Sequence, residues 1–451
     1  MIYKIKKIIR AIMPQFVISG YHLGLVWLSA FLYHFPSRHM VVIGVTGTKG
    51  KTTVTELANA FLEKMGRRTA LINSLRFKIG EKTWPNKLKM TMPGRFFIQK
   101  FLYNAWRKKC NYVIVEVTSE GIKQFRHKFI NFDVVAFNNL QPEHLEAHGG
   151  SMEKYREAKE KLFAALDGGK KRIPICERIG QFEVFCKNAS VVNMDDLAAP
   201  NFLKYPASEK IGFSLKNKDG GVKELIQPQK YSVGSEGIKF ELDGLEFYSS
   251  LKGEFNLYNI LSAIAICRAL DVPLTNIKDA LQDFDGIPGR MEEIKQGQDF
   301  RIFVDFAHTP DSLLAVYQTL RQEVPKGSTK LIAVFGSTGG GRDKWKRPAM
   351  GKVAADYCDE IIITNDDPYD ENPQKILEEI AIGVKVENHS YKMIEDRREA
   401  IREAFRLAKK GDCVIITGKG SEQAMVMAGG KKIPWDDRKV VKEELENLKT
   451  K

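Results

Sequence analysis

The sequence predicts an α/β protein with two nucleotide-scale domains, and three observations carry this prediction. Short runs rich in Val and Ile alternate with segments of helical character along most of the chain. Two of these runs, 112–117 and 132–137, are almost wholly apolar, as is typical of parallel strands buried on both faces. A second alternation of the same kind begins after residue 290. We therefore expect a central domain with a mostly parallel sheet, followed by a Rossmann-like α/β domain.

Residues 1–39 form an apolar and basic helical segment ahead of the first domain. Four basic residues precede an uncharged run over 16–33, and prolines bracket that run; the basic residues are Lys4, Lys6, Lys7 and Arg10. Three interpretations stay open: a helix packed on the domain, a helix lying at a membrane surface, and a membrane-spanning helix. The run is at the lower length limit for a span, which favours the first two.

Residues 42–53 read as a strand, a Gly-rich loop and a helix that opens with Lys-Thr-Thr. Glycines let backbone N–H groups approach phosphates, and a helix N-terminus adds a favourable dipole. Lys51 supplies a point charge, and Thr52 offers a hydroxyl to Mg²⁺. The spacing departs from the strict P-loop, because Gly44 lies six residues before Gly50 and Val45 stands at the first glycine position. We expect a P-loop ATPase domain in which ATP contacts Gly47, Thr48, Lys49, Gly50, Lys51, Thr52 and Thr53.

The remaining elements follow from periodicity. Alternating residues between 211 and 251 predict a small antiparallel patch, and a helix is expected over 258–270. The segment 285–290 is a plausible linker, which sets the domains at 40–286 and 287–451. Strands of the second domain are expected at 302–305, 331–335, 360–364 and 413–417, with a solvated terminal helix after 440.

Composition excludes several classes of protein. The content of 43% hydrophobic and 28% charged residues is that of a soluble globular chain. The net charge of +14 suits anionic small substrates, because basic residues are mixed with acids along most of the chain and no aromatic-basic motif for nucleic acid occurs. Six isolated cysteines predict neither a zinc site nor a disulfide framework. We expect a cytoplasmic monomer that binds no nucleic acid.

Several short motifs follow one another along the chain in an order that is typical of one protein family. They are Glu116-Val117-Thr118-Ser119, Asn139-Leu140-Gln141-Pro142-Glu143-His144-Leu145, Tyr155-Arg156-Glu157-Ala158-Lys159, Phe255-Asn256-Leu257-Tyr258-Asn259, Pro288-Gly289-Arg290-Met291-Glu292, Asp305-Phe306-Ala307-His308-Thr309-Pro310-Asp311, Gly418-Lys419-Gly420 and Asp436-Asp437-Arg438. With Gly-Thr-Lys-Gly-Lys-Thr-Thr, in which Lys49 replaces the usual Asn, they resemble the Mur ligases of peptidoglycan synthesis. The pattern is most similar to the ligase that adds the third residue to UDP-N-acetylmuramoyl-dipeptide.

The resemblance implies roles for individual residues. Lys51, Lys159, His144 and His308 would be catalytic, with Lys159 carbamoylated by CO₂. Thr52, Glu116, His144 and Lys159 would hold Mg²⁺ at two sites. Asn256 and Asn259 would face the base of ATP, Arg290 its nucleotide, and Asp305 its inter-domain side. The incoming substrates would meet Thr91, Pro93, Thr118, Ser119, Asp366, Asp367, Tyr369, Gly418, Lys419 and Glu422, and the Gly-rich stretch 336–343 resembles a second anion loop.

The chain also departs from the family pattern. Diaminopimelate-adding enzymes show Asp-Asn-Pro-Arg where this chain has Asp366-Asp367-Pro368-Tyr369, so we expect an amino acid without a distal carboxylate, such as lysine. Ser421 replaces a His, and Glu120 takes the place of the His that usually follows Glu-Val-Ser-Ser. A uridine-binding α/β domain is not expected, because only residues 1–39 precede the first domain.

The implied function is an ATP-dependent amide ligase that forms an acyl phosphate and adds an amino acid to a muramoyl peptide. Two alternatives stay open: a ligase like folylpolyglutamate synthase, and a membrane-associated nucleotide-binding protein without turnover. The segment 1–36 leaves peripheral contact with the inner face of the membrane open as well.

Overall fold

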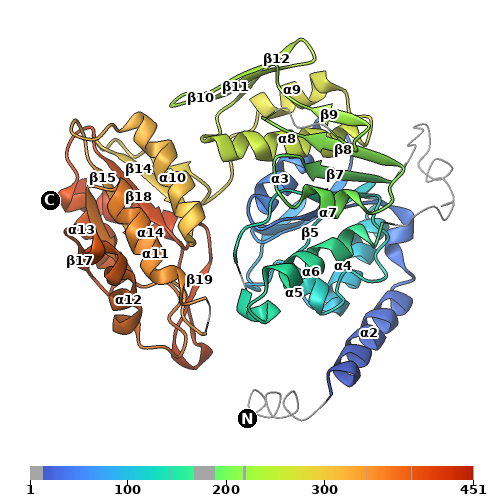
Figure 1. The fold of residues 1–451 in the computed structure, drawn as a ribbon, viewed down its shortest axis with the longest axis horizontal. Helices are drawn as coiled ribbons and strands as arrows, with labels where there is room; N and C mark the ends of the chain where they lie inside the picture. Colours follow the sequence, from blue (N-terminus) through green and yellow to red (C-terminus); the bar gives the residue numbers. More distant parts are fainter. Residues whose placement is uncertain are drawn as a thin grey trace. The chain divides into compact units, whose positions relative to one another are not determined.

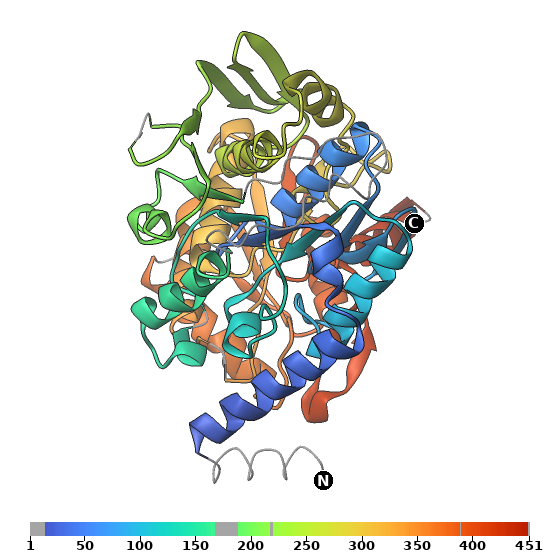
Figure 2. The same ribbon diagram turned by 90° about the vertical axis from the view of Figure 1, so that its right-hand side faces the viewer.

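The computed structural model describes residues 14–143, 145–166, 188–216, 220–341, 343–387 and 389–449 (Figures 1 and 2). The chain divides into two compact units by its contacts. The first unit takes in the ranges up to 142, 147–228 and 258–281. The second takes in 143–146, 229–257 and 282 onward.

A nine-stranded sheet is the centre of the first unit. Its spatial order is β4 (Lys82–Pro85), β3 (Arg76–Ile79), β2 (Thr69–Ile72), β5 (Tyr112–Glu116), β1 (Val41–Thr46), β6 (Val134–Phe137), β7 (Ala189–Asn193), β8 (Glu209–Phe213) and β9 (Glu224–Ile226). Every pairing from β2 to β9 is parallel, whereas β2–β3 and β3–β4 are antiparallel. The central strands β1, β5 and β6 are buried along their whole length, as their uninterrupted apolar sequence requires.

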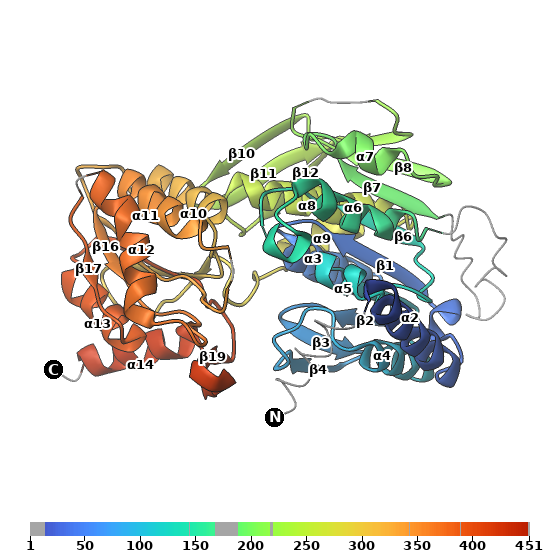
Figure 3. The same ribbon diagram turned by 60° about the horizontal axis from the view of Figure 1, so that its bottom comes forward.

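Helices accompany this sheet in the first unit (Figure 3). They are α2 (Gln15–Leu32), η1 (Pro36–His39), α3 (Lys51–Lys64), α4 (Arg95–Arg107), α5 (Ser119–Lys123), α6 (Met152–Phe163), α7 (Ala199–Leu203) and α9 (Leu274–Gln282), while α8 (Glu254–Arg268) and η2 (Leu145–His148) have residues in both units. Within the first unit's core, Gly44 of β1 gives close access to α6, because a Cβ there would lie 2.8 Å from the ring of Phe132 and 3.2 Å from Leu162. Gly44 thus serves packing inside the strand rather than the phosphate loop.

The second unit is built on a six-stranded sheet. Its order is β13 (Glu292–Glu293), β14 (Arg301–Asp305), β18 (Cys413–Thr417), β15 (Leu331–Phe335), β16 (Glu360–Ile363) and β17 (Lys392–Met393), all parallel except β13. One apolar core joins the sheet to α10 (Pro310–Glu323), α11 (Lys346–Tyr357) and α12 (Pro373–Val386), and a second joins it to α13 (Arg397–Leu407) and α14 (Asp437–Lys449). Alternate residues of each strand enter alternate cores, which makes this a doubly wound sheet.

Two small antiparallel sheets complete the second unit. One consists of β10 (Lys230–Gly234), β11 (Gly237–Leu242) and β12 (Leu245–Ser249), and the other of β19 (Ala424–Val426) and β20 (Lys432–Pro434), with η4 (Ala428–Gly430) between the last two.

The predicted fold class is confirmed, and two details of the prediction are wrong. The antiparallel patch begins at Lys230, because β8 and β9 continue the parallel sheet. The terminal helix is not simply solvated, since Val440, Val441 and Leu445 are at most 3% exposed in the second core. Among the described cysteines, Cys110, Cys267, Cys358 and Cys413 are free and buried; Cys176 and Cys186 lie outside the described residues. No helix in the described ranges has the length and apolar character needed to cross a membrane.

Candidate active site

The phosphate loop connects β1 to α3 in the first unit. Gly47 and Gly50 have φ values of 155° and 78°, which Gly adopts without strain. The side chain of Asn139 shapes the loop, because its Oδ1 accepts from the backbone N–H groups of Thr48 (3.1 Å) and Lys49 (2.8 Å). Asn259 lies against the loop as well, since a Cβ on Gly50 would come within 2.0 Å of Asn259 Oδ1. The glycine is therefore required both by backbone conformation and by the close approach of α8.

Two lysine ammonium groups converge on one carbonyl oxygen of this loop. Lys51 Nζ donates to Gly47 O at 3.0 Å and to Thr48 O at 2.8 Å, and Lys159 Nζ donates to the same Gly47 O at 2.7 Å. Lys159 is only 1% exposed and also lies over the ring of Tyr155, 4.4 Å from its centroid. The structure thus brings together two lysines that are 108 positions apart at the expected phosphate position.

The burial of Lys159 has a simple origin in the sequence. Tyr155, Ala158, Leu162 and Phe163 are buried and recur at helical spacing along α6, and Lys159 falls on the same face. Lys159 is therefore buried, although the many charged residues of this segment would also suit an exposed helix. The apolar stripe was the signal that could have identified it.

A candidate Mg²⁺ site lies at the start of α3. Thr52 Oγ1 donates to Glu116 Oε2 at 3.0 Å, and Ser74 contributes its hydroxyl 2.7 Å from Thr52 Oγ1 and its backbone N–H at 3.0 Å to the same carboxylate. Hydroxyl and carboxylate oxygens fit Mg²⁺, which commonly uses one or two protein ligands together with phosphates and water. The described residues contain no group of three His, Cys, Asp or Glu arranged to hold a metal, and His144 lies outside them. Ser74 is a neighbour of the site that sequence reasoning missed.

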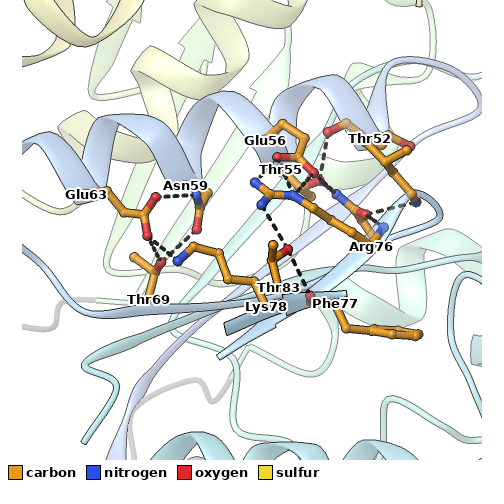
Figure 4. A network of polar contacts seen from close by, with 12 residues as sticks. Thr52, Thr55, Glu56, Asn59, Glu63, Thr69, Arg76, Phe77, Lys78 and Thr83 are labelled. Carbon is orange, nitrogen blue, oxygen red and sulfur yellow. Dashed lines mark hydrogen bonds and ion pairs between the residues drawn. The ribbon is translucent and has the colours of Figure 1, made fainter. Parts of the chain in front are cut away.

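A polar network holds α3 against β2 and β3 (Figure 4). Arg76 pairs with Glu56 at 2.6 Å, and Lys78 pairs with Glu63 at 2.7 Å. Asn73, in the β2–β3 turn next to Ser74, donates to Thr55 Oγ1 at 3.2 Å and to Glu56 at 2.8 Å. The network fixes the helix that carries Lys51 and Thr52 relative to the turn that contacts Glu116.

Thr118 and Ser119 lie at the end of β5, next to Glu116. Thr118 caps α5 by accepting from Gly121 N at 3.2 Å, and Ser119 Oγ lies 3.1 Å from His148 Nε2. The His148 ring lies 5.2 Å from that of Tyr155, whose hydroxyl lies 3.3 Å from Thr48 Oγ1. Burial lowers the pKa of His148; the charge of Glu120 opposes this shift, and the charges of Lys123, Lys159 and Lys161 add to it.

Thr91 and Pro93 belong to the loop before α4. Met92 between them packs closely on Gly121 of α5, where a Cβ would lie 2.3 Å from Met92 Sδ. This contact brings the loop next to the Thr118–Ser119 segment.

The second unit holds the remaining ATP candidates. Asp305, at the end of β14, accepts from the backbone N–H groups of Met291 (2.7 Å) and Ala307 (2.6 Å). The guanidinium of Arg290 lies 4.3 Å from the centroid of the Phe306 ring. His308 Nδ1 lies 2.8 Å from Phe306 O, and Lys346 Nζ donates to His308 O at 3.0 Å. Asn256 donates to Lys252 O at 2.8 Å in the first turn of α8.

The amino-acid candidates form a buried charge cluster. Lys419 has no exposed surface and lies 2.8 Å from Asp367 Oδ1, 2.5 Å from Glu422 Oε2 and 3.5 Å from Asp366 Oδ1. Burial disfavours the charge of Lys419, but the three carboxylates outweigh burial and raise its pKa. A Cβ on Gly418 would lie 3.1 Å from Asp366 Oδ2, so the glycine permits this approach.

Buried arginines support this cluster, and the sequence did not indicate them. Arg397 forms a bidentate pair with Asp437 at 2.9 and 2.7 Å, with both side chains fully buried, and donates to Asn365 O and Thr417 O. Asp437 of the Asp-Asp-Arg motif is therefore a structural partner of the strand ends that carry Asp366 and Gly418.

The Gly-rich stretch 336–341 packs on the segment that carries Tyr369. A Cβ on Gly339 would lie 2.2 Å from Pro368 O, and one on Gly340 would lie 3.0 Å from the Tyr369 ring. Gly341 N donates to Glu371 at 2.8 Å, and the fully buried Arg347 pairs with Glu371 at 3.1 Å and Glu379 at 2.6 Å. Gly339 and Gly340 are needed for this close packing. Within the described residues, the anion that this loop binds is the carboxylate of Glu371.

These features define a P-loop α/β protein whose loop, lysines and oxygen ligands suit a nucleoside triphosphate with a divalent cation. Comparisons agree with this class. Residues 45–267 match the Mur ligase middle domain, and residues 289–420 match the Mur ligase, glutamate ligase domain.

Individual relatives are similar over most of the chain. A UDP-N-acetylmuramoyl-L-alanyl-D-glutamate--2,6-diaminopimelate ligase of Syntrophomonas wolfei is 36% identical over 427 residues, which are 94% of this chain and 81% of the relative. A solved structure of an enzyme of that name is 28% identical with a TM-score of 0.57, over 91% of this chain and 79% of that one. Folylpolyglutamate synthase of Mycobacterium tuberculosis has a TM-score of 0.66 at 16% identity, over 88% and 92% of the two chains, and shares the fold.

The chain belongs to the Mur ligase family, whose members are ATP-dependent carbon–nitrogen ligases. The resemblance that the motifs indicated is thereby confirmed.

Proposed function

We propose that this ligase joins an amino acid to the terminal carboxylate of a muramoyl peptide in peptidoglycan precursor synthesis. The observation that carries the proposal is the convergence of Lys51 and Lys159 on Gly47 O, next to the Thr52–Glu116 pair. This arrangement concentrates positive charge and metal-binding oxygens where a γ-phosphate and a carboxylate would meet.

The reaction has two steps. A carboxylate oxygen of the peptide attacks the γ-phosphorus of ATP, ADP leaves, and an acyl phosphate forms. The amine of the incoming amino acid then attacks the acyl carbon, the C–N bond forms, the C–O bond to phosphate breaks, and the amine loses its proton. Lys51 stabilises the charge of the transferred phosphoryl group in the first step.

We propose that Mg²⁺ is held at two positions. The first would use Thr52, Glu116 and, by the family resemblance, His144, and the second would use Lys159 as a carbamate. When bound, Mg²⁺ screens the two anions that must approach each other. His308, Asp305, Arg290, Asn256 and Asn259 are proposed to contact ATP.

The carbamate has a physical argument in its favour. Two ammonium groups on one carbonyl oxygen repel each other, and addition of CO₂ to Lys159 would replace that repulsion by attraction to Lys51. A carbamate is also an oxygen ligand of the kind that Mg²⁺ prefers.

For the amino acid we propose lysine or another substrate without a distal carboxylate. The relatives named above are diaminopimelate ligases, but Tyr369 stands where such enzymes show arginine. Asp370 and Glu371, next to Tyr369, accept from Gly429 N (2.7 Å) and Gly341 N, and Glu371 also pairs with Arg347. The three carboxylates of Asp366, Asp367 and Glu422 share the single ammonium of Lys419, and this excess of negative charge would attract a substrate ammonium. We further propose that the enzyme is a monomer and acts in the cytoplasm, where ATP and nucleotide-linked precursors are found.

Phosphate release tests the proposal. Purified protein is incubated with ATP and Mg²⁺, and phosphate is measured against single amino acids in the presence of muramoyl or folyl acceptors. We expect release to require an amino acid together with a muramoyl acceptor. Release with a folyl acceptor alone, or release independent of any amino acid, would contradict it.

Lys51→Ala should abolish phosphate release, with a loss of about 1,000-fold or more, because it removes the charge over the phosphates. The fold should stay intact, since Lys51 is half-buried at the N-terminus of α3 and is not part of an apolar core. Lys64→Ala, at the exposed far end of α3, is the matched control and should retain activity. Unchanged turnover in Lys51→Ala would refute the role of the loop.

A further inference from the structure

Helix α2 has its small side chains on the domain and its large apolar side chains in solvent. Val26, Ser29 and Ala30 are at most 1% exposed, whereas Tyr21 is 61% and Phe31 is 55% exposed. An ordinary surface helix shows the reverse arrangement, with its large apolar residues inward.

The exposed half of α2 is uninterruptedly apolar. At 3.6 residues per turn, one continuous arc of about half the circumference contains Leu23, Trp27, Phe31, Gly24, Leu28, Tyr21 and Leu32. The helix contains no Asp, Glu, Lys or Arg, and the Trp27 and Phe31 rings stack with centroids 5.4 Å apart. A contiguous apolar surface of this kind marks an interaction site.

Helix α4 lies beside α2 (Figure 3; α2 is also the dark blue helix of Figure 2) and has exposed aromatic and basic side chains of its own. Tyr103 of α4 has its ring 5.8 Å from that of Tyr33. Lys100 and Arg107 are exposed and lie one turn before and one turn after Tyr103 on the same helix face. Phe96, 39% exposed, precedes Lys100 by one turn. We call this surface the α2–α4 face; it comprises Tyr21, Trp27, Phe31, Phe96, Lys100 and Arg107.

The net charge of the chain is concentrated in the two sequence segments that contain these helices. Residues 1–55 and 82–115 contain no Asp or Glu and fifteen Lys and Arg, whereas the whole chain has a net charge of +14. Lys49 and Lys51 of this set belong to the phosphate loop. The rest of the chain is therefore close to neutral. Lys100 and Arg107 of this set belong to the α2–α4 face, and Lys4, Lys6, Lys7 and Arg10 lie outside the described residues.

We propose that the α2–α4 face docks on the surface of an anionic lipid bilayer. Aromatic side chains and basic residues on one surface are the combination that binds the headgroup region, with apolar contact below it and anionic lipids around it. Since no described helix can cross a membrane, the contact is interfacial. A bilayer is favoured over a second copy of the chain, because two such faces would bring like charges together.

Vesicle binding by the full chain tests the proposal. Co-sedimentation is measured with vesicles of phosphatidylcholine alone and with about one third phosphatidylglycerol. We expect binding to be at least about tenfold stronger with the anionic lipid and to weaken as salt rises, because screening shortens the reach of the basic residues. No binding to anionic vesicles at about 0.15 M salt would overturn the proposal.

Matched variants distinguish binding through the α2–α4 face from non-specific adsorption to vesicles. Trp27→Gln with Phe31→Gln should weaken vesicle binding about tenfold or more. Ile382→Gln with Val386→Gln is the control, because these α12 residues have the same spacing and are 52% and 75% exposed. Lys100→Glu with Arg107→Glu should remove the preference for anionic lipid, and Lys230→Glu with Lys239→Glu, exposed on β10 and β11, should not. Equal effects of a pair and its control would overturn the proposal.

Two further results would assign the face to another occupant and so overturn the proposal. If a second copy of the chain covers the face, sedimentation velocity without lipid would show a dimer. The double variant Trp27→Gln with Phe31→Gln would then be a monomer. The fluorescence of Trp27 is obtained as the difference between the spectra of the full chain and of Trp27→Phe. If another part of the chain covers the α2–α4 face, this fluorescence would be blue-shifted and protected from acrylamide quenching even without lipid. We expect a monomer and a Trp27 emission that shifts to the blue only when anionic vesicles are added.

Discussion

At the scale of single residues, side chains far apart in sequence determine the chemistry of the loop. Lys159 reaches Gly47 O because it falls on the buried stripe of α6, and Glu116 is held by Thr52 and Ser74 from two different elements. The motifs identify these residue types, and the tertiary contacts give each one its partner.

Lys159→Ala should lower ligase activity by about 100-fold or more, because the proposed carbamate oxygens and one Mg²⁺ position are lost. Short carboxylates added to this variant should restore part of the rate, and Lys159→Glu should be more active than Lys159→Ala. Lys161→Ala, exposed on the same helix, is the control. The carbamate is excluded if bicarbonate depletion and Lys159→Glu both leave the rate unchanged.

Tyr369 governs the prediction for the incoming amino acid. Lysine should be used with a kcat/KM at least about tenfold above that of meso-diaminopimelate, because the phenol cannot form the bidentate pair that arginine gives to a carboxylate. Tyr369→Arg should shift the ratio toward diaminopimelate. The substitution adds no backbone strain, because φ at this position is 52°, a value that is equally unfavourable for Tyr and for Arg. Similar turnover of both amino acids by the unaltered enzyme would count against the prediction.

At the scale of elements, the β2–β3 turn connects α3 to Glu116, the carboxylate proposed to hold Mg²⁺. Asn73 donates to Thr55 and Glu56 of α3 and accepts from Leu75 N at 2.9 Å and Arg76 N at 2.8 Å, while its neighbour Ser74 contacts Glu116. The antiparallel pair β3–β4 and this turn were not expected from the sequence, because their strands are four residues long and carry no strong alternation.

Asn73→Ala should lower the free energy of unfolding by about 2–4 kcal/mol, because it leaves buried hydrogen-bonding groups of α3 and of the turn without a partner. Urea denaturation measures the change. Asn104→Ala, exposed on α4, should alter stability by less than about 0.5 kcal/mol. A similar loss in the two variants would show that the network is not specific.

At the scale of the whole molecule, a buried neutral histidine makes the stability of the fold depend on pH. His127 is 1% exposed, and neither ring nitrogen has a hydrogen-bond partner among the described residues. Burial, then the charges of Lys128 and Lys161, lowers the pKa of His127 from 6.5 to about 3. Between these values the unfolded chain binds a proton that the folded chain does not, so stability falls as pH falls.

His127→Phe should reduce this pH dependence. Between pH 7 and pH 5, the free energy of unfolding of the unaltered chain should fall by about 2 kcal/mol more than that of the variant. The reason is that His127 lowers the free energy of unfolding by about 1.4 kcal/mol for each pH unit below its unfolded pKa. Denaturant melts at both pH values give the difference and cancel the other titrating groups. His34→Gln, an exposed histidine, should retain the full dependence; an unchanged dependence in His127→Phe would contradict the prediction.

Much of the fold and the loop could be predicted from the sequence. The apolar strands, the second α/β alternation and the Gly-Lys-Thr-Thr loop are local patterns, and β5, β15 and β18 lie at or within a residue of their expected bounds. The predicted boundary between parallel and antiparallel strands was wrong. The short alternation at Ile211–Phe213 fits a parallel or an antiparallel neighbour equally well, and the structure pairs this strand in parallel with β7. The pairing of Asp367 with Lys419 and of Asp437 with Arg397 could not be predicted, because the partners are 52 and 40 positions apart in the sequence.

The sequence by itself determined the class of protein, the phosphate loop and the family, because these are written in residue types at fixed local spacing. The tertiary structure decided which charges are buried and what holds them. Lys159 shares a carbonyl with Lys51, and Lys419 is enclosed by three carboxylates. It also decided that α2 turns its small side chains inward and its aromatic residues outward. The burial of Lys159 could have been inferred from the apolar stripe of α6, but pairing between distant segments is contained in no local pattern.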